Sequence, residues 1–134
     1  MKTVYNNIIP LKGFKAITIY PFVFVRKSAR FTSTDEYHER IHAKQQKECL
    51  TVAVPVAAVL WAAGCGAWSL LALPLFFWWY IVEWLVRIVQ YGSPHKAYRN
   101  ISFEREAYQW QDNRYYLAMR PHFSWFRYIK SNTK

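Results

Sequence analysis

His38, Glu39 and His42 are the residues whose types and spacing point most directly to chemistry, because they form the pattern HExxH. In a helix, positions four apart share one face, so the two imidazoles would lie one turn apart beside a carboxylate. Zinc binds neutral imidazole nitrogens, and a neighbouring glutamate can accept a proton from metal-bound water. The pattern therefore predicts two metal ligands and a general base. The alternative is a surface helix carrying two unrelated histidines.

Composition and charge favour a membrane protein over a nucleic-acid-binding protein. The 134 residues are 53% hydrophobic and 19% aromatic, with 7 Trp and a net charge of +10. A nucleic-acid groove interleaves aromatic and basic residues on one surface. Here they are segregated, because residues 49–82 carry no charge and the basic residues lie on either side. We expect a single domain, residues 1–134, bound to a lipid bilayer, and no nucleic-acid partner.

The chain before the uncharged stretch predicts a short β segment followed by the HExxH helix. Residues 8–25 are rich in β-branched and aromatic side chains, and Pro21 argues against a central strand position. Ser33 or Thr34 is expected to cap a helix over residues 34–48, since acidic residues follow in its first turn.

Residues 49–89 predict an apolar helical hairpin with its turn at Gly64-Cys65-Gly66. The first limb would span only about 24 Å, so a full crossing is favoured but a re-entrant hairpin stays open. Tryptophans 78, 79 and 84 indicate a belt near the membrane interface. Cys49 and Cys65 are interpreted as small apolar residues.

Charge bias predicts the orientation of this hairpin. Residues 1–48 hold nine Lys or Arg and residues 90–134 hold eight, so both flanks are expected on the cytoplasmic face. An even number of crossings satisfies that bias. Glu83 and Arg87 lie four apart and are expected to pair with each other, with Glu83 as a metal ligand the alternative.

After a turn at residues 91–94, a polar helix is expected over residues 99–119, ended by Pro121. The tail, residues 123–130, mixes aromatic and basic side chains, which is typical of a segment lying on an anionic membrane surface.

Two histidines leave a catalytic zinc one protein ligand short. Glu48 lies where metzincin proteases have a third histidine, but Gln45 replaces the glycine that makes their turn, so an unbroken helix would carry Glu48 away. The remaining candidates are two histidines in expected turns and two glutamates on different faces of the later helix. These are His95, His122, Glu104 and Glu106.

The segment Asn100-Ile101-Ser102-Phe103-Glu104-Arg105-Glu106-Ala107-Tyr108 resembles a motif of the gluzincin metallopeptidases. In their membrane-embedded branch, which includes the CAAX-prenyl protease and the heat-shock membrane protease, the later motif reads NxxxExxAD. Asn100, Glu104 and Ala107 stand in that register, with Tyr108 in place of the aspartate. The segment also looks like the Glu-x-x-Ala-Asn signature of small phage-repressor-cleaving metalloproteases. Small uncharacterised bacterial membrane proteins with HExxH and FEREAY motifs look closer still.

This resemblance implies that His38, His42 and Glu104 bind Zn²⁺, that Glu39 is the catalytic base and that Glu106 is the fallback ligand. It also implies a transmembrane hairpin between the two motifs, in agreement with the charge bias.

The expected fold is mainly α, with a short N-terminal β segment, the HExxH helix, the apolar hairpin and a C-terminal helix carrying the glutamate, in a minimal zincin-like arrangement. The expected function is that of a zinc metallopeptidase in the bacterial inner membrane, with both termini and the active site on the cytoplasmic face and a peptide or protein as substrate. The alternative is a non-catalytic, basic membrane-hairpin protein, holin-like or scaffolding, with a structural or vestigial metal site.

Four residues are candidates for stabilising the oxyanion, namely Tyr98, Tyr108, His95 and Arg105. A membrane di-iron hydroxylase is set aside, because such sites use many more histidines than the 4 present.

Overall fold

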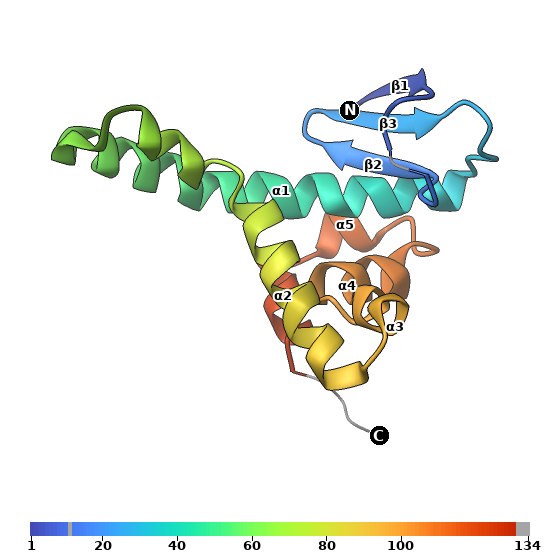
Figure 1. Ribbon diagram of the computed structural model, residues 1–134. Helices are drawn as coiled ribbons and strands as arrows, with labels where there is room; N and C mark the ends of the chain where they lie inside the picture. The colour runs from blue at the N-terminus through green and yellow to red at the C-terminus, as the bar shows by residue number, and fades with distance from the viewer. Residues whose placement is uncertain (11, 131–134) are drawn as a thin grey trace.

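The computed structural model describes residues 1–10 and 12–130 and is mostly helical, with a short N-terminal sheet (Figure 1). Leu11 and residues 131–134 of the expected single domain lie outside the described residues. Helix α1 lies between the sheet on one side and the C-terminal helices on the other. The elements in chain order are β1 Lys2–Asn6, β2 Ala16–Ile19, β3 Phe22–Arg26, α1 Ser33–Leu60, η1 Trp61–Cys65, η2 Gly66–Ala72, α2 Leu75–Tyr91, α3 Pro94–Arg99, α4 Ser102–Trp110, α5 Tyr116–Met119 and η3 Ser124–Tyr128.

The sheet has the strand order β1-β3-β2, with β2 and β3 antiparallel and β1 parallel to β3. Pro21 lies in the turn between β2 and β3, away from a central strand position, as expected. Strand β1 was not predicted, because its residues are mostly exposed and show no clear alternation. Val23 and Val25 are buried, whereas the neighbouring side chains of β3 are more exposed.

Helix α1 runs without a break from the HExxH segment into the first limb of the hairpin, so the helix expected over residues 34–48 is the first part of a longer one. Its N-cap is Thr32, not Ser33 or Thr34. The Thr32 hydroxyl accepts a hydrogen bond from the Asp35 amide, and the Asp35 carboxylate accepts one from the Thr32 amide. This capping box begins the helix earlier than the acidic residues alone indicated.

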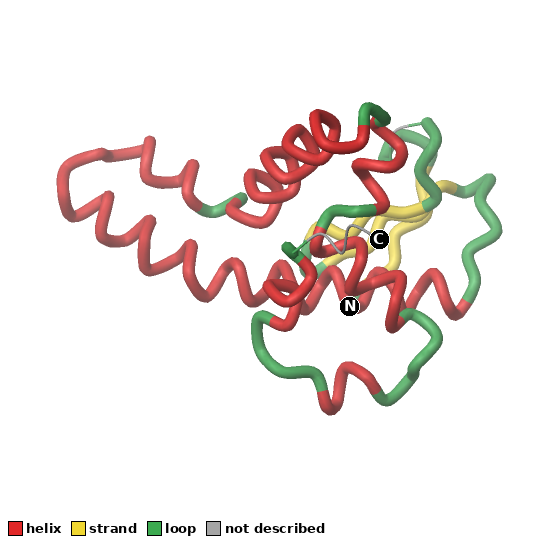
Figure 2. Tube along the Cα trace, turned by 90° about the horizontal axis from the view of Figure 1, so that it is seen from below, coloured by secondary structure: helices red, strands yellow, loops and turns green. Residues whose placement is uncertain are grey.

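The expected hairpin is present, but its second limb is short. Segments η1 and η2 return beside the end of α1, as Figure 1 and Figure 2 both show, and α2 then leaves at a steep angle. Among the described residues, one helical stretch, Ser33–Ala72, is long and apolar enough to cross a membrane. Only 17% of its most apolar part is buried inside the molecule, unlike the core helix of a soluble protein.

The polar helix expected over residues 99–119 was wrong as a single element, because the chain forms α3, α4 and α5 instead. Residues 111–115 form a turn in which the Asn113 side chain accepts a hydrogen bond from the Tyr115 amide, and such local bonds compete with the helix. The α4 N-terminus is capped by the Glu83 carboxylate of α2, which accepts from the Ser102 amide and hydroxyl. A cap from a distant helix leaves no local sequence signal.

The C-terminal tail packs into the core, which differs from the expected surface segment. Trp125 is 3% exposed and contacts Phe103, which in turn stacks on Phe76 of α2 with ring centroids 4.4 Å apart. Burying three aromatic side chains together contributes several kcal/mol. This aromatic cluster therefore fixes α2, α4 and η3 relative to one another.

Candidate metal centre

Three ligand-type side chains from two helices meet in one buried cluster: His38 and His42 of α1 and Glu104 of α4. Their ligand atoms all lie within 4.8 Å of one another. Nε2 of His38 is 3.0 Å from Nε2 of His42, and each of these nitrogens is 3.3 Å from a carboxylate oxygen of Glu104. The structure thus brings together the three residues expected to bind metal.

Close packing of α4 on α1 positions the Glu104 carboxylate. Ala107, one turn after Glu104, is fully buried against Tyr37 and Ile41 of α1. A small side chain at this position lets the two helices approach closely. Glu104 consequently projects toward the histidine face of α1.

Hydrogen bonds fix the proton position on His42. The Gln45 amide nitrogen donates to the Phe103 carbonyl and to the Glu106 carboxylate, at 3.1 and 2.9 Å. Both are acceptors, so the Gln45 amide oxygen must face His42, whose Nδ1 lies 2.8 Å away. Nδ1 therefore carries a proton. Burial alone would lower the pKa of His42, but the charge of Glu104 outweighs it and raises the pKa to about 9, so Nε2 is protonated as well at neutral pH. A bound metal ion would take the place of the Nε2 proton, and the neutral ring would then present its Nε2 lone pair to the ion.

His38 is oriented in a similar way from the end of α4. Its Nδ1 lies 3.0 Å from the amide oxygen of Gln111. The ring of Tyr108 packs edge-on against His38 with centroids 4.7 Å apart, and the guanidinium of Arg99 lies 3.9 Å over that tyrosine ring. Tyr108, which replaces the aspartate of the NxxxExxAD motif, thus holds a ligand-type ring in place by packing.

The Glu104 carboxylate is charged and incompletely satisfied. The Tyr80 hydroxyl donates to its Oε1 at 2.8 Å, but its Oε2 is buried with no hydrogen-bond partner. Burial alone would raise the pKa of Glu104, but the positive charge of His42 and the contacts of the carboxylate with both histidine rings outweigh it and hold the pKa well below its ordinary value.

This donor set fits a zinc ion. Two imidazole lone pairs and a carboxylate converge on one point, where an ion would satisfy the orphaned oxygen of Glu104. Two nitrogens about 2.0–2.1 Å from one tetrahedral zinc ion would lie about 3.3 Å apart, close to the observed separation of the two Nε2 atoms. Two histidines and one glutamate are also the protein ligands of many catalytic zinc sites, which keep a fourth position open.

Glu39 lies beside the cluster but outside the ligand set. The Thr18 hydroxyl of β2 lies 2.7 Å from a Glu39 carboxylate oxygen and donates to it, and the Thr18 carbonyl accepts a hydrogen bond from the Gln46 side chain at 2.7 Å. Gln46 also accepts from the Tyr20 amide at 2.8 Å. Strand β2 is thereby pinned to α1, and the sheet serves to orient the expected base.

The structure narrows the four candidates for stabilising an oxyanion. Arg105 donates to the carbonyls of Tyr128 and Lys130, and His95 is exposed in α3. The ring of Tyr108 packs on His38. Burial and the negative charge of Glu104 raise the pKa of Tyr98 far above its ordinary value, so Tyr98 stays a neutral hydrogen-bond donor near the cluster.

The other candidate ligands lie elsewhere. Glu48 and Glu106 both pair with Arg120, whose guanidinium is buried between them. Glu106 also accepts from the Tyr116 hydroxyl at 2.7 Å. His122 is exposed and lies 3.7 Å from Glu48. The fallback ligand Glu106 is therefore part of a buried ion-pair network that reaches His42 through Gln45.

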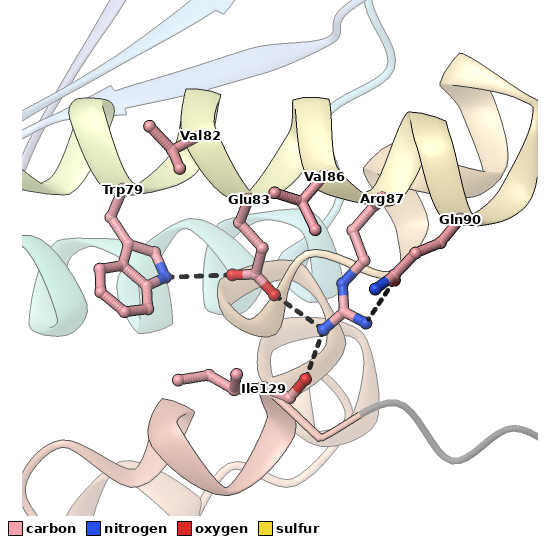
Figure 3. Close-up of a pocket in the computed structure, with 7 residues that line it drawn as sticks. All are labelled: Trp79, Val82, Glu83, Val86, Arg87, Gln90 and Ile129. Atoms are coloured by element: carbon pink, nitrogen blue, oxygen red, sulfur yellow. Dashed lines mark hydrogen bonds and ion pairs between the residues drawn. The ribbon is translucent and has the colours of Figure 1, made fainter.

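Glu83 pairs with Arg87, as expected, and is not a member of the cluster. Figure 3 shows this pair, with the Trp79 indole donating to Glu83 and Arg87 donating to the carbonyl of Ile129. A cavity of about 250 Å³ opens here, and none of the three metal-type residues lines it. The pair ties α2 to α4 through Ser102 and to the segment after η3 through Ile129.

Comparison with protein-family models, with curated proteins and with solved structures finds no match for this chain. The resemblance to gluzincins therefore stays a prediction, as do the metal-binding and catalytic roles.

Four residues that hydrogen-bond to the candidate ligands or to Glu39 were not anticipated from the sequence, and one of them could have been. Gln45 lies three positions after His42, on the same helical face, so a search for partners of the histidines would have reached it. Thr18, Tyr80 and Gln111 come from other elements and are brought in by tertiary packing alone.

Replacing Gln45 by leucine should weaken metal binding by roughly 10-fold to 100-fold, because His42 loses the partner that fixes its proton on Nδ1. Competition with a chelator of known affinity measures the change. Gln46→Leu is the matched control, since Gln46 holds β2 and makes no contact with the histidines. Equal metal affinity in the Gln45 variant and the wild type would show that His42 does not depend on this contact.

Proposed function

We propose that this protein is a small membrane-bound zinc metallopeptidase that hydrolyses peptide bonds, with His38, His42 and Glu104 as the zinc ligands and Glu39 as the general base. The observation that carries the proposal is the position of Glu104. Its carboxylate oxygens lie 3.3 Å from both histidine Nε2 atoms, although Glu104 belongs to a separate helix. The resemblance to gluzincins adds to this geometry.

Zinc, when bound, would polarise the scissile carbonyl and make water a better nucleophile at neutral pH. Glu39 accepts a proton from the attacking water and then delivers it to the leaving amine. The hydrogen bond from Thr18 orients the Glu39 carboxylate. It restricts the side-chain rotamers of Glu39 during the proton transfer. Tyr98 supplies a neutral hydroxyl near the cluster as a donor to the developing oxyanion.

Membrane attachment on the cytoplasmic face of a bacterial inner membrane belongs to the same proposal. The sheet lies against the first half of α1, and α4 lies against the same part of the helix. The flanks that precede and follow the hairpin therefore lie on one side of it. Both flanks are basic, which favours the cytoplasmic side. The metal cluster lies in this same body.

The test compares new protein N-termini in cells that produce the wild type or Glu39→Gln. A peptidase creates N-termini that appear with the wild type only and that fade when zinc is withheld. Identical sets of N-termini in the two strains, with both proteins present in the membrane at equal amounts, would count against peptidase activity and favour the non-catalytic membrane-hairpin protein.

A further inference from the structure

The uncharged stretch divides into two structurally different parts. Residues 49–72 form a hairpin that projects from the body, with η2 beside the end of α1. Helix α2 then turns away and runs along the body toward α3. The hairpin and the first half of α2 share an uncharged sequence, but they meet their surroundings differently.

Helix α2 cannot serve as the returning membrane crossing, because its inner face belongs to the body that holds the metal cluster. Tyr80 donates to Glu104, a proposed ligand, at 2.8 Å. One turn later, Glu83 caps α4 through Ser102. If α2 lay across the hydrocarbon core, α3 and α4 would enter it as well, and the exposed cations of α3 would lose their water.

The two limbs of the hairpin are too short to cross. From Cys49 to Cys65 the outgoing limb rises at most about 25 Å, at 1.5 Å per residue. The returning limb η2 has 7 residues in a 3₁₀ conformation and spans about 14 Å. A bilayer has a hydrocarbon core about 30 Å thick, so one leaflet accounts for about 15 Å. The hairpin therefore matches one leaflet and not two.

The surface of the hairpin suits lipid. Ala53, Ala57 and Ser69 are buried, and such small residues let two limbs pack closely. The Ser69 hydroxyl donates to the Gly66 carbonyl at 2.8 Å, so this polar group is satisfied internally. The outward residues are large and apolar: Val52, Val54, Val56, Val59, Leu60, Trp61, Trp68, Leu70 and Leu71.

Helix α2 is amphipathic with the usual orientation reversed: its charged residues face the protein and its apolar residues face outward. Phe76, Glu83 and Arg87 are buried, whereas the opposite face exposes Trp78, Ile81, Val82, Leu85, Val86 and Val89. An exposed apolar stripe of this size on a helix that cannot cross is typical of a helix lying in the membrane interface. Trp78 joins the two parts, since its indole donates to the Leu71 carbonyl at 2.8 Å.

We propose that the protein is monotopic: the hairpin enters the cytoplasmic leaflet only, and the outer face of α2 lies along the membrane surface. The partner of this whole surface is one lipid leaflet. The inference rests on the membrane attachment in the proposed function and is independent of the zinc chemistry. It favours the re-entrant hairpin over the full crossing expected from the sequence. It also places the metal cluster close to the lipid headgroups, because Tyr80 of the membrane-surface helix α2 contacts Glu104.

The depth of Cys65 at the hairpin tip tests this arrangement. Cys65 is exposed and the only other cysteine, Cys49, is buried, so a nitroxide label attaches at the tip of the native chain. We would reconstitute labelled protein in vesicles of zwitterionic and anionic lipid and measure collision rates with oxygen, which partitions into hydrocarbon, and with a water-soluble nickel chelate. Ser28→Cys in a Cys65→Ala background is the control, because Ser28 lies in an exposed turn of the body.

The monotopic arrangement predicts high collision with oxygen and low collision with nickel at Cys65, and the reverse at residue 28. High collision of Cys65 with nickel would overturn the monotopic arrangement. If only chelate on the far side of the vesicle membrane collides with Cys65, the hairpin crosses the bilayer completely. If chelate on the side of the body collides with it, the hairpin lies outside the lipid. Low collision with both reagents would overturn it in favour of contact with a second protein copy. Zinc content measured on the same vesicles reports on the metal site separately.

Discussion

The rate of hydrolysis should fall by about 100-fold to 10,000-fold when Glu39 is replaced by glutamine, while the zinc content stays unchanged. Glutamine keeps the shape of the side chain and can still accept a hydrogen bond from Thr18, but it cannot take a proton from water. Glu39 is not one of the three ligand-type residues, so metal binding should survive. Single-turnover cleavage of a responsive substrate, with zinc measured on the same sample, checks both halves of this prediction.

Glu36→Gln is the matched control for this variant. Glu36 precedes Glu39 by about one turn, makes an exposed pair with Arg40 and has no contact with the cluster. Loss of the Glu36–Arg40 ion pair should leave both the rate of hydrolysis and the zinc content unchanged, because exposed pairs of this kind contribute at most about 1 kcal/mol to stability. A Glu39→Gln protein that cleaves as fast as Glu36→Gln would remove Glu39 from the mechanism.

Replacing Arg120 by methionine should destabilise the fold by about 3–5 kcal/mol, because two buried carboxylates lose the arginine that pairs with both of them. The Glu48 and Glu106 side chains are 4% and 0% exposed, and Arg120 contacts both. Hydrogen bonds to the two carboxylates outweigh burial and raise the pKa of Arg120, so its charge is secure in the folded state. The midpoint of thermal unfolding in lipid or detergent should fall by roughly 10 °C or more.

Two further variants separate lost charge from lost packing. Arg114→Met makes the same change in the exposed turn before α5 and should leave the midpoint within about 2 °C. Adding Glu48→Gln and Glu106→Gln to Arg120→Met should recover part of the stability, since neutral amides cost less to bury unpaired. No recovery would mean that Arg120 acts through shape alone.

The local parts of the site could be predicted from sequence, because they depend on helical periodicity. HExxH gave the spacing of His38 and His42 on one face of α1, and the register with Asn100 and Ala107 selected Glu104. Asn100 itself donates to the Lys96 carbonyl at the end of α3, so it helped as a marker of register and not as a ligand.

The remaining features depend on tertiary contacts that leave no local signal. The break after Trp110 and the cap that Glu83 provides for α4 split the expected long helix. The uncharged run indicated a hairpin but could not show that α2 joins the body, because the first half of α2, residues 75–82, is as uncharged as the limbs. Two contacts between α2 and α4 decide that question: Tyr80 donates to Glu104, and Glu83 accepts from Ser102.

Zinc content in purified protein tests the central claim most directly. Protein produced with zinc and transferred to detergent should hold one equivalent of metal per chain in the wild type and in Glu36→Gln, and lose it in Glu104→Gln, with helicity by circular dichroism unchanged in all three. Glu104 is the decisive position because it alone comes from outside α1. A folded wild-type protein that takes up no zinc, or a Glu104→Gln protein that binds it as tightly as the wild type, would contradict the proposed site.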